Sequence, residues 1–348
     1  MNGSAEVLRA PFPYFGGKRR AAPLIWNALG DPGGYVEPFA GSAAVLLARP
    51  AVKGRRVETI NDADGWLVNM WRAIQQSPEE VAMHAAGPVT EIDYHARLAW
   101  LHERRGQWLV SWLEGDPENH DAKAAGWWLY VMAAGIADPF GPGPWRVIEG
   151  RLQDTRKLPH LGDPGQGVKR KLPHLGDPGQ GVNRELPHLG DPGRGVNRGL
   201  PHLGDPRQGV IEYMRRLAAR LSRVRITCGS WERVLTPAVV RARAGGDGGI
   251  GILLDPPYAT SGHLYAHGDD GPLSTEVRQW CLTAPEHYRI VLCGYDGEHA
   301  ELEQHGWRVI EGRSGGGAGY STDGTAGHRE RLWLSPACIG KGQEVLFP

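Results

Sequence analysis

Short apolar runs alternate along the chain with segments whose apolar residues recur every three to four positions. The runs predict buried strands, and the periodic segments predict amphipathic helices. Predicted strands are Arg56–Ile60, Val224–Cys228, Ile250–Leu254 and Arg289–Cys293; predicted helices are Ala21–Leu29, Gly65–Gln75, Tyr94–Arg105, Ala122–Ala134, residues 211–222 and Ser274–Leu282; a closing hairpin pairs Trp307–Ile310 with Arg331–Leu334. Alternation of strands and helices indicates an α/β fold on a mostly parallel sheet.

The tetrapeptide Asp255-Pro256-Pro257-Tyr258 directly follows the apolar run Ile250–Leu254, so it is expected at the carboxyl end of a central strand. Open α/β sheets bind their ligands at that edge. The Asp255 carboxylate and the Pro256 carbonyl are two acceptors, two prolines stiffen the loop, and Tyr258 offers a flat face for stacking. These properties suit a site that grips a planar exocyclic amine. A proline-rich turn that only ends the strand is the alternative.

A strand, a turn of small residues and a helix follow one another between Gly34 and Ala48, with Glu37-Pro38-Phe39-Ala40-Gly41-Ser42-Ala43 forming the turn. Gly41 lets backbone amides approach a ligand, and Phe39 can wall its other side. Asp62 lies 21 positions after Gly41, near the spacing at which an acidic residue binds a ribose diol. The alternative role for Asp62 is the N-cap of the helix Gly65–Gln75.

The chain contains neither G-x-G-x-x-G nor G-x-x-x-x-G-K-[ST], which disfavours dinucleotides and nucleoside triphosphates as ligands. A turn that is less directed at phosphate suits S-adenosylmethionine, which has none. Upstream, Tyr14-Phe15-Gly16-Gly17-Lys18 combines aromatic residues, glycines and a lysine that could meet a carboxylate or a phosphate. An ordinary glycine turn before a helix is the alternative there.

Residues 78–134 are predicted to be helical, and the aromatic group Trp127-Trp128 with Tyr130 favours core packing over base stacking. A 14-residue unit then begins at Leu158, Leu172, Leu186 and Leu200. Its Gly-Asp-Pro-Gly turns and few apolar residues predict an extended arm over 158–210, either tracking DNA or acting as a spacer. Its regularly repeated histidines (His160, His174, His188, His202) need no metal-binding role.

Composition limits the possible partners and the cellular compartment. The formal net charge is zero and the pI is about 7.3, so any nucleic-acid surface must be local. Four cysteines (Cys228, Cys281, Cys293, Cys338) are widely spaced, which argues against a zinc site or a disulfide framework and fits a reducing cytoplasm. The sequence shows no signal peptide and no apolar run long enough to span a membrane.

Four motifs in a fixed order, Tyr14–Lys18, Glu37–Ala43, Asn61-Asp62 and Asp255–Tyr258, resemble those of the Dam-type (D12 class) N6-adenine DNA methyltransferases. The resemblance covers about residues 11–75 and 211–335. It implies a Rossmann-like S-adenosylmethionine-dependent sheet with an antiparallel last strand, made of residues 1–77 and 211–336. Residues 78–210 would form a target-recognition region, with residues 337–348 as a tail. The 14-residue repeats also resemble those of some phage and prophage members.

The resemblance also implies roles for individual residues. Tyr14, Lys18, Phe39, Gly41 and Asp62 would contact S-adenosylmethionine. Asp255 and Pro256 would hold the target amine, Pro257 would stiffen the loop, and Tyr258 would stack on the flipped base. One departure is Ala43, which replaces the last glycine of the family's Phe-x-Gly-x-Gly, a change that is tolerable unless φ is positive there. Ser230 stands where many relatives carry an acidic residue.

The expected activity is methyl transfer from S-adenosylmethionine to adenine N6 in double-stranded DNA, by a monomer that uses no metal, in the cytoplasm of a bacterium or a phage-infected cell. Methylation of cytosine N4 favours Ser-Pro-Pro-Tyr, and methylation of glutamine favours Asn-Pro-Pro-Tyr, so Asp255 counts against both. A non-catalytic DNA-binding modification subunit is a further alternative. The sequence does not specify the DNA site or the biological role.

Overall fold

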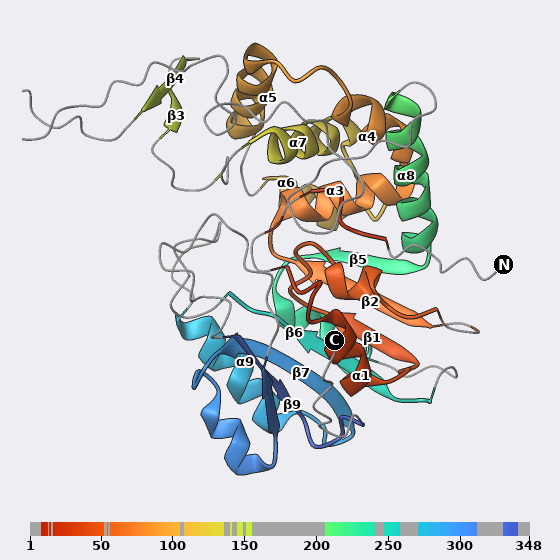
Figure 1. The fold of residues 1–348 in the computed structure, drawn as a ribbon, viewed down its shortest axis with the longest axis vertical. Helices are drawn as coiled ribbons and strands as arrows, with labels where there is room; N and C mark the ends of the chain where they lie inside the picture. Colours follow the sequence, from red (N-terminus) through yellow and green to blue (C-terminus); the bar gives the residue numbers. More distant parts are fainter. Residues whose placement is uncertain are drawn as a thin grey trace, which may run out of the picture.

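The computed structural model describes residues 8–12, 14, 17–51, 54, 56–104, 108–135, 140, 145–148, 151–154, 206–240, 247–257, 271–311 and 330–339 (Figure 1). Two sequence expectations fall outside these residues: most of the repeat arm, and the proposed base-stacking Tyr258. Among the described residues no helix is long and apolar enough to cross a membrane.

A seven-stranded sheet in the order β5-β2-β1-β6-β7-β9-β8 forms the centre of the molecule (Figure 1). Its strands are β1 Gly34–Glu37, β2 Val57–Asp62, β5 Val224–Cys228, β6 Ile250–Leu254, β7 Tyr288–Tyr295, β8 Arg308–Glu311 and β9 Glu330–Leu334. The first five in spatial order are parallel, while β9 runs antiparallel to β7 and to β8. This topology confirms the predicted Rossmann-like methyltransferase sheet with an antiparallel end. Separately, β3 Trp145–Ile148 pairs with β4 Arg151–Asp154.

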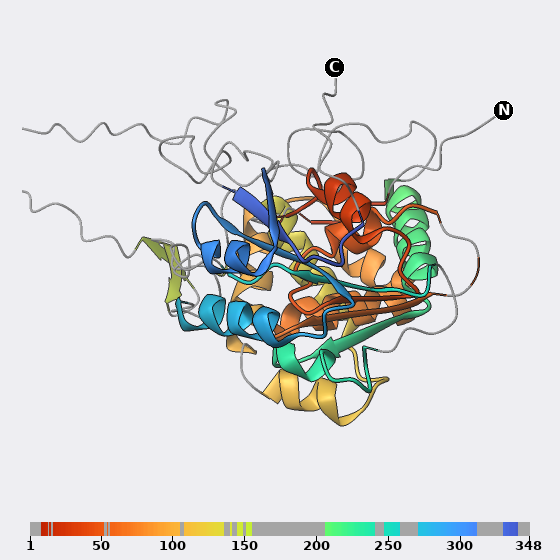
Figure 2. The same cartoon turned by 90° about the horizontal axis from the view of Figure 1, so that it is seen from below.

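Each face of the sheet has its own hydrophobic core, because successive residues of a strand point to opposite faces. On β7, Val291 and Cys293 join one core, while Ile290 and Leu292 join the other. The first core is covered by the helices α1 Ala22–Leu29, α2 Ala44–Leu47, α3 Gly65–Gln76 and α8 Pro206–Leu221. The second is covered by α9 Gly271–Thr283 and the 3-10 helices η1 Trp231–Val234 and η3 Ala300–His305 (Figure 2).

A helical region extends from the α3 and α8 side of the sheet (Figure 1). It contains α4 Pro78–Ala85, α5 Glu91–Glu103, α6 Trp108–Gly115 and α7 Ala122–Ala134. Trp128 and Tyr130 are buried, which confirms the core interpretation for both. Side chains cap the amino ends of two of these helices: Thr90 accepts a hydrogen bond from Asp93 N, and Asp121 accepts one from Ala124 N.

Two expectations about element ends were wrong. The helix α8 starts at Pro206, so the last five positions assigned to the extended arm are helical. Its apolar face, including Val210, Met214 and Leu217, is buried, and this packing outweighs the turn-rich sequence before it. At the other end, Cys338 is buried and Ile339 N donates to Ala28 O, so the packed chain extends beyond Pro336.

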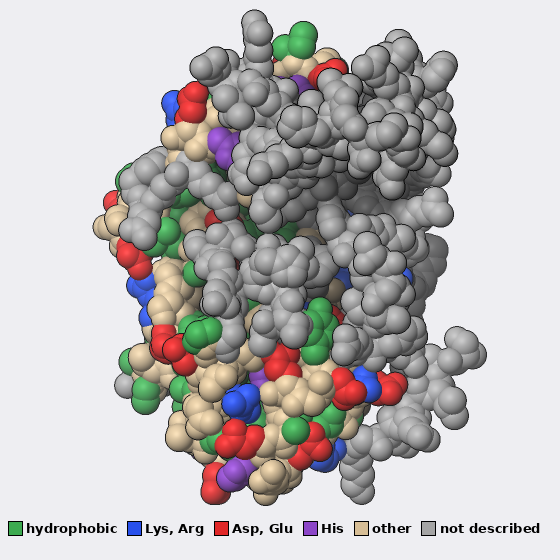
Figure 3. Space-filling model, turned by 90° about the vertical axis from the view of Figure 1, so that its left-hand side faces the viewer, with side chains coloured by type: hydrophobic (Ala, Val, Ile, Leu, Met, Phe, Trp, Pro, Cys, Tyr) green, Lys and Arg blue, Asp and Glu red, His purple; other side chains and the backbone are tan. Residues whose placement is uncertain are grey.

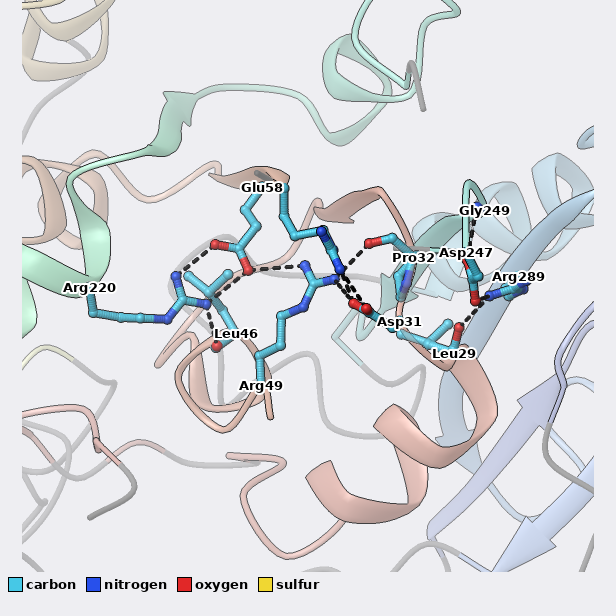
Figure 4. A network of polar contacts seen from close by, with 11 residues as sticks. Leu29, Asp31, Pro32, Leu46, Arg49, Glu58, Arg220, Asp247, Gly249 and Arg289 are labelled. Atoms are coloured by element: carbon cyan, nitrogen blue, oxygen red, sulfur yellow. Dashed lines mark hydrogen bonds and ion pairs between the residues drawn. The ribbon is translucent and has the colours of Figure 1, made fainter. Parts of the chain in front are cut away.

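An ion-pair network links α8, α2, β2 and the loop before β1 at the amino ends of the strands (Figure 4). Arg49 of this network lies 3.1 Å from Glu58 and 3.2 Å from Asp31. Arg220 lies 2.6 Å from Glu58, and Arg56 lies 2.5 Å from Asp31. Arg49 is 3% exposed, so the cation at the centre of these contacts is shielded from water, whereas Asp31 is 45% exposed.

Candidate active site

The strand β6 places Asp255 at the carboxyl edge of the sheet, next to the loop that leaves β1. In the parallel pairing of β1 with β6, Val36 lies opposite Ile252. The turn that begins at Glu37 and the loop that begins at Asp255 therefore leave the sheet side by side. All of Ile250–Leu254 is buried, and Asp255 is 20% exposed. The two motifs, far apart in the sequence, therefore meet at one edge, as predicted.

Lys18 joins these two halves of the site. Its Nζ lies 2.9 Å from Asp255 Oδ1 and 3.6 Å from Glu330 Oε1 of β9, and the lysine is only 5% exposed. Lys18 thus contacts carboxylates of the protein itself, and its contact with a ligand stays a prediction. Glu330 was not among the predicted site residues, because an acidic residue at the start of a terminal hairpin strand carries no motif.

The Cys293 thiol completes the surroundings of Asp255. Cys293 is fully buried on β7, near the Asp255 carboxylate. Burial, and then the negative charge of Asp255, raise the pKa of Cys293 well above that of a free thiol, so it remains a neutral thiol. Sequence analysis had treated this cysteine only as evidence of a reducing compartment.

Asp62 organises the small-residue turn from the end of β2. One of its oxygens accepts from Gly41 N at 2.9 Å, and the other accepts from Asp64 N at 2.9 Å. The N-cap of α3 is Asp64, whose side chain accepts from Trp66 N, so the alternative N-cap role of Asp62 is wrong. A carboxylate has about four acceptor sites, so holding this turn is compatible with binding a ribose diol.

The turn itself requires left-handed backbone at two positions. Gly41 has φ +46° and Ala43 has φ +47°. A Cβ added at Gly41 would lie 2.5 Å from the Tyr14 ring, so glycine is needed there for packing as well as for conformation. L-residues are strained at positive φ, whereas glycine is not. The replacement of the family's glycine by Ala43 is therefore costly at this position.

Glu37 lies buried at the start of the same turn and accepts a hydrogen bond from Tyr35 Oη at 3.1 Å. Burial raises its pKa to about 8, and the nearby negative charge of Asp255 also raises it. Glu37 is therefore largely protonated at neutral pH. Sequence analysis included it in the turn motif without a role of its own, because its burial beside Asp255 depends on the pairing of β1 with β6.

Aromatic side chains border the turn on the α9 side of the sheet. Phe39 stacks on Trp231 with ring centroids 6.0 Å apart, and Trp231 meets the Trp280 ring edge to face at 6.2 Å. Trp231 is 8% exposed. Ser230, the weak candidate, donates to Glu232 at the surface. Phe39 is thus held in place by Trp231 beside the turn, and its contact with a cofactor stays a prediction.

Residues 14–91 match the family model of the D12 class N6 adenine-specific DNA methyltransferases. This similarity to the D12 class domain is confined to residues 14–91 of the 348-residue chain. No curated protein matches the sequence. The matched segment contains Tyr14, Lys18, Phe39, Gly41 and Asp62, and the fold brings Asp255 to it from outside the matched segment.

The protein is accordingly an S-adenosylmethionine-dependent enzyme that methylates adenine N6 in DNA. The donor groups present fit this cofactor: a carboxylate at the turn, a tight Gly41 backbone and the apolar wall of Phe39. Within the described part of the chain, no group of three or more histidine, cysteine, aspartate or glutamate residues could hold a metal ion.

Proposed function

We propose that Asp255 and the Pro256 carbonyl hold the amine of an adenine extruded from double-stranded DNA, beside S-adenosylmethionine bound by the 37–43 turn and Asp62. The observation that carries this proposal is the 2.9 Å contact between Lys18 and Asp255. It links the loop before the cofactor turn to the loop after β6. A base inside a duplex cannot reach an edge pocket, so extrusion is required, at a cost of a few kcal/mol.

The residues act on the amine by position and electrostatics. The lone pair of an aromatic amine is delocalised into the ring, so acceptors on its two hydrogens help to pyramidalise nitrogen and direct the lone pair. S-adenosylmethionine, when bound, supplies a methyl group on positively charged sulfur; the N6–C bond forms as the S–C bond breaks, and one amine proton leaves to water. Lys18, 2.9 Å from Asp255, keeps the carboxylate oriented.

Further assignments within this function complete the proposal. Tyr14, Lys18, Phe39, Gly41 and Asp62 form the cofactor site, Pro257 stiffens the loop, and Tyr258, outside the described residues, stacks on the base. The enzyme acts as a monomer without a metal. Four free cysteines, all buried, support a reducing cytoplasmic location. Equilibrium sedimentation would test the monomer.

Residues 78–210 are proposed to contact DNA, and one surface of α5 and α7 supports this assignment. Trp100 and Trp127 lie edge to face at 5.0 Å. Lys123 Nζ lies 4.4 Å from the Trp127 ring centre, and Arg104 Cζ lies 3.9 Å from that of Trp100. Exposed cations beside indole rings suit phosphates and bases.

The opposite end of the molecule is less suited to DNA. Exposed carboxylates border α9, η3 and β8, namely Glu276, Glu286, Glu301, Glu303 and Glu311. Figure 3 shows acidic side chains gathered at the lower end of that face. They would repel phosphates, so the helical region is the favoured DNA surface.

Replacement of Asp255 tests the catalytic assignment. The change Asp255→Ala should lower kcat for methylation of a DNA substrate by at least about 100-fold, because an acceptor for the amine is removed. Binding of S-adenosylmethionine, measured by calorimetry, should be largely retained. Asp296→Ala, at an exposed carboxylate just after β7, is the matched control. Turnover near that of the wild type in the Asp255 variant would refute the assignment.

A salt titration tests the DNA surface. The double change Arg104→Gln and Lys123→Gln should reduce the slope of log K against log salt by about 0.9 for each phosphate that the variant no longer neutralises. Arg215→Gln, an exposed arginine on α8 paired with Glu79, should leave the slope unchanged. Equal slopes in all three proteins would place DNA binding elsewhere, with the catalytic assignment unaffected.

A further inference from the structure

Arginines of the segment before α1 gather beside the catalytic edge of the sheet. Arg19 and Arg20 directly follow Lys18, whose ammonium lies 2.9 Å from Asp255. Lys18 is buried within the site, whereas Arg19 and Arg20 are exposed, and Arg9, earlier in the segment, is half-buried. These three, here called the N-terminal arginines, therefore place positive charge on the surface next to the residue that contacts Asp255.

Helix α8 holds Arg9 in place through a tyrosine. Arg9 N donates to Tyr213 Oη at 2.8 Å, and Tyr213 Oη donates to Arg9 O at 2.8 Å. Arg216 Cζ lies 5.8 Å from the centre of the same ring. Partial burial, and then the positive charge of Arg9, lower the pKa of Arg19, yet arginine stays protonated at neutral pH. Arg9 and Arg19 thus lie close enough to repel each other.

The direction of α8 shows which edge of the sheet these charges border. Helices α1 and α8 cover the same face of the sheet (Figure 2). Arg220 in the last turn of α8 contacts Glu58 near the start of β2, so this end of the helix lies at the amino edge. Tyr213 lies earlier on the helix, about 10 Å away at about 1.5 Å per residue, and so toward the carboxyl edge. In the same segment, Phe12 packs on Trp128 of α7 with ring centroids 4.9 Å apart. The segment therefore joins the catalytic edge to the helical region.

Carboxylates of the described residues do not balance the N-terminal arginines. Within that part of the chain these arginines form no ion pair. Arg215 on α8 differs, since its hydrogen bond with Glu79 and, further, the charge of Glu212 raise its pKa. Like charges that are gathered without carboxylates repel one another, and a bound polyanion removes this repulsion. The surface at the N-terminal arginines is therefore suited to a chain of phosphates.

We infer that the N-terminal arginines bind backbone phosphates of the DNA strand that carries the extruded adenine. This inference rests on the proposed function. An adenine held at Asp255 brings the phosphates of its own nucleotide to this edge of the sheet, and Arg19 and Arg20 adjoin the lysine that contacts Asp255. Contacts to phosphates fix the position of a strand without reading its sequence. The N-terminal arginines thus hold the target strand, while the indole rings of α5 and α7 lie on a separate surface.

The test measures binding and methylation of a duplex by the full chain. The double change Arg19→Gln and Arg20→Gln should reduce the slope of log K against log salt by about 0.9 for each phosphate that is no longer neutralised. It should raise KM for DNA about tenfold with little change in kcat, because these contacts are made equally in the ground and transition states. The affinity for S-adenosylmethionine, measured by calorimetry, should stay the same. Arg19→Lys with Arg20→Lys should keep most of the slope, and Arg215→Gln all of it.

Substrates with one uncharged methylphosphonate linkage locate the contact and do not depend on the folding of a variant. A neutral linkage beside the target adenine should weaken binding to the wild type and have no effect on the double glutamine variant. An unchanged slope and KM in that variant, or a wild type that tolerates a neutral linkage at every position of the target strand, overturns the inference while leaving the proposed function standing. A wild type that neither binds nor methylates DNA overturns both.

Discussion

Both ends of the parallel sheet contain a buried cation between two carboxylates, yet the two clusters are built differently. At the amino ends, Arg49 is 3% exposed between Asp31 and Glu58. At the carboxyl ends, Lys18 is 5% exposed between Asp255 and Glu330. The guanidinium is a planar fork that fixes several acceptors at once, whereas an ammonium is a compact point charge.

The surrounding charges differ as well. Arg56 and Arg220 also bind the amino-end carboxylates, so the acceptors of that cluster are engaged by several protein donors. At the carboxyl-end cluster, Asp255 is an acceptor suited to an outside amine. A buried cation therefore fixes strand ends at one edge and lies beside a ligand acceptor at the other.

Removal of Glu58 should produce the largest loss of stability. Glu58→Ala leaves Arg49 buried without one of its partners and deprives Arg220 of its carboxylate, so the free energy of unfolding should fall by about 3–5 kcal/mol. Urea denaturation followed by circular dichroism measures this. Glu330→Ala, at the carboxyl edge of the sheet, should lower the free energy of unfolding by clearly less, because Lys18 still has Asp255 as an ion-pair partner. Equal losses of unfolding free energy in the two variants would contradict the distinction between a structural cluster and a ligand-binding cluster.

The pH dependence of stability should report the protonated Glu37. Because its folded pKa is raised to about 8 from an ordinary value of 4.5, its stabilising contribution is complete below about pH 4.5 and is lost as pH rises to about 8. Within that window the free energy of unfolding should fall by about 1.4 kcal/mol for each pH unit.

The variant Glu37→Gln isolates this effect, since it removes the titration and keeps the side-chain volume. Urea denaturation at pH 6 and at pH 8 should show a smaller decrease in stability for the variant than for the wild type. Identical decreases in the two proteins would show that Glu37 is already ionised at pH 6.

The strain at Ala43 should give the smallest effect. Ala43→Gly removes the strain of a left-handed alanine, which costs about 1–2 kcal/mol. The greater conformational entropy of glycine in the unfolded chain offsets this by about 0.4–1 kcal/mol. A net gain of up to about 1 kcal/mol is expected in thermal unfolding. Affinity for S-adenosylmethionine should stay equal or rise. A clear loss of stability would mean that the buried alanine methyl group contributes more by packing than its backbone costs.

The sequence by itself determined the strands of the seven-stranded sheet, most helices and the motifs at the strand ends, because hydrophobic periodicity and turn chemistry are local; the pair β3 and β4 was not predicted. Val224–Cys228 and Ile250–Leu254 were predicted with the bounds that the structure shows, and the antiparallel final hairpin was confirmed. The start of α8 at Pro206 was missed, since helix formation there depends on a face buried by distant residues.

Only the tertiary structure decided the electrostatics of the site. Glu37, Cys293 and Glu330 belong to three different strands; Glu37 lies in a recognisable turn motif, but nothing in the residues around Cys293 and Glu330 marks them. They matter because parallel pairing of β1, β6 and β7, with β9 antiparallel beside them, brings them to Asp255 and Lys18. Burial and charge are properties of that assembled edge, so the sequence could name the motifs but not the balance of charge around them.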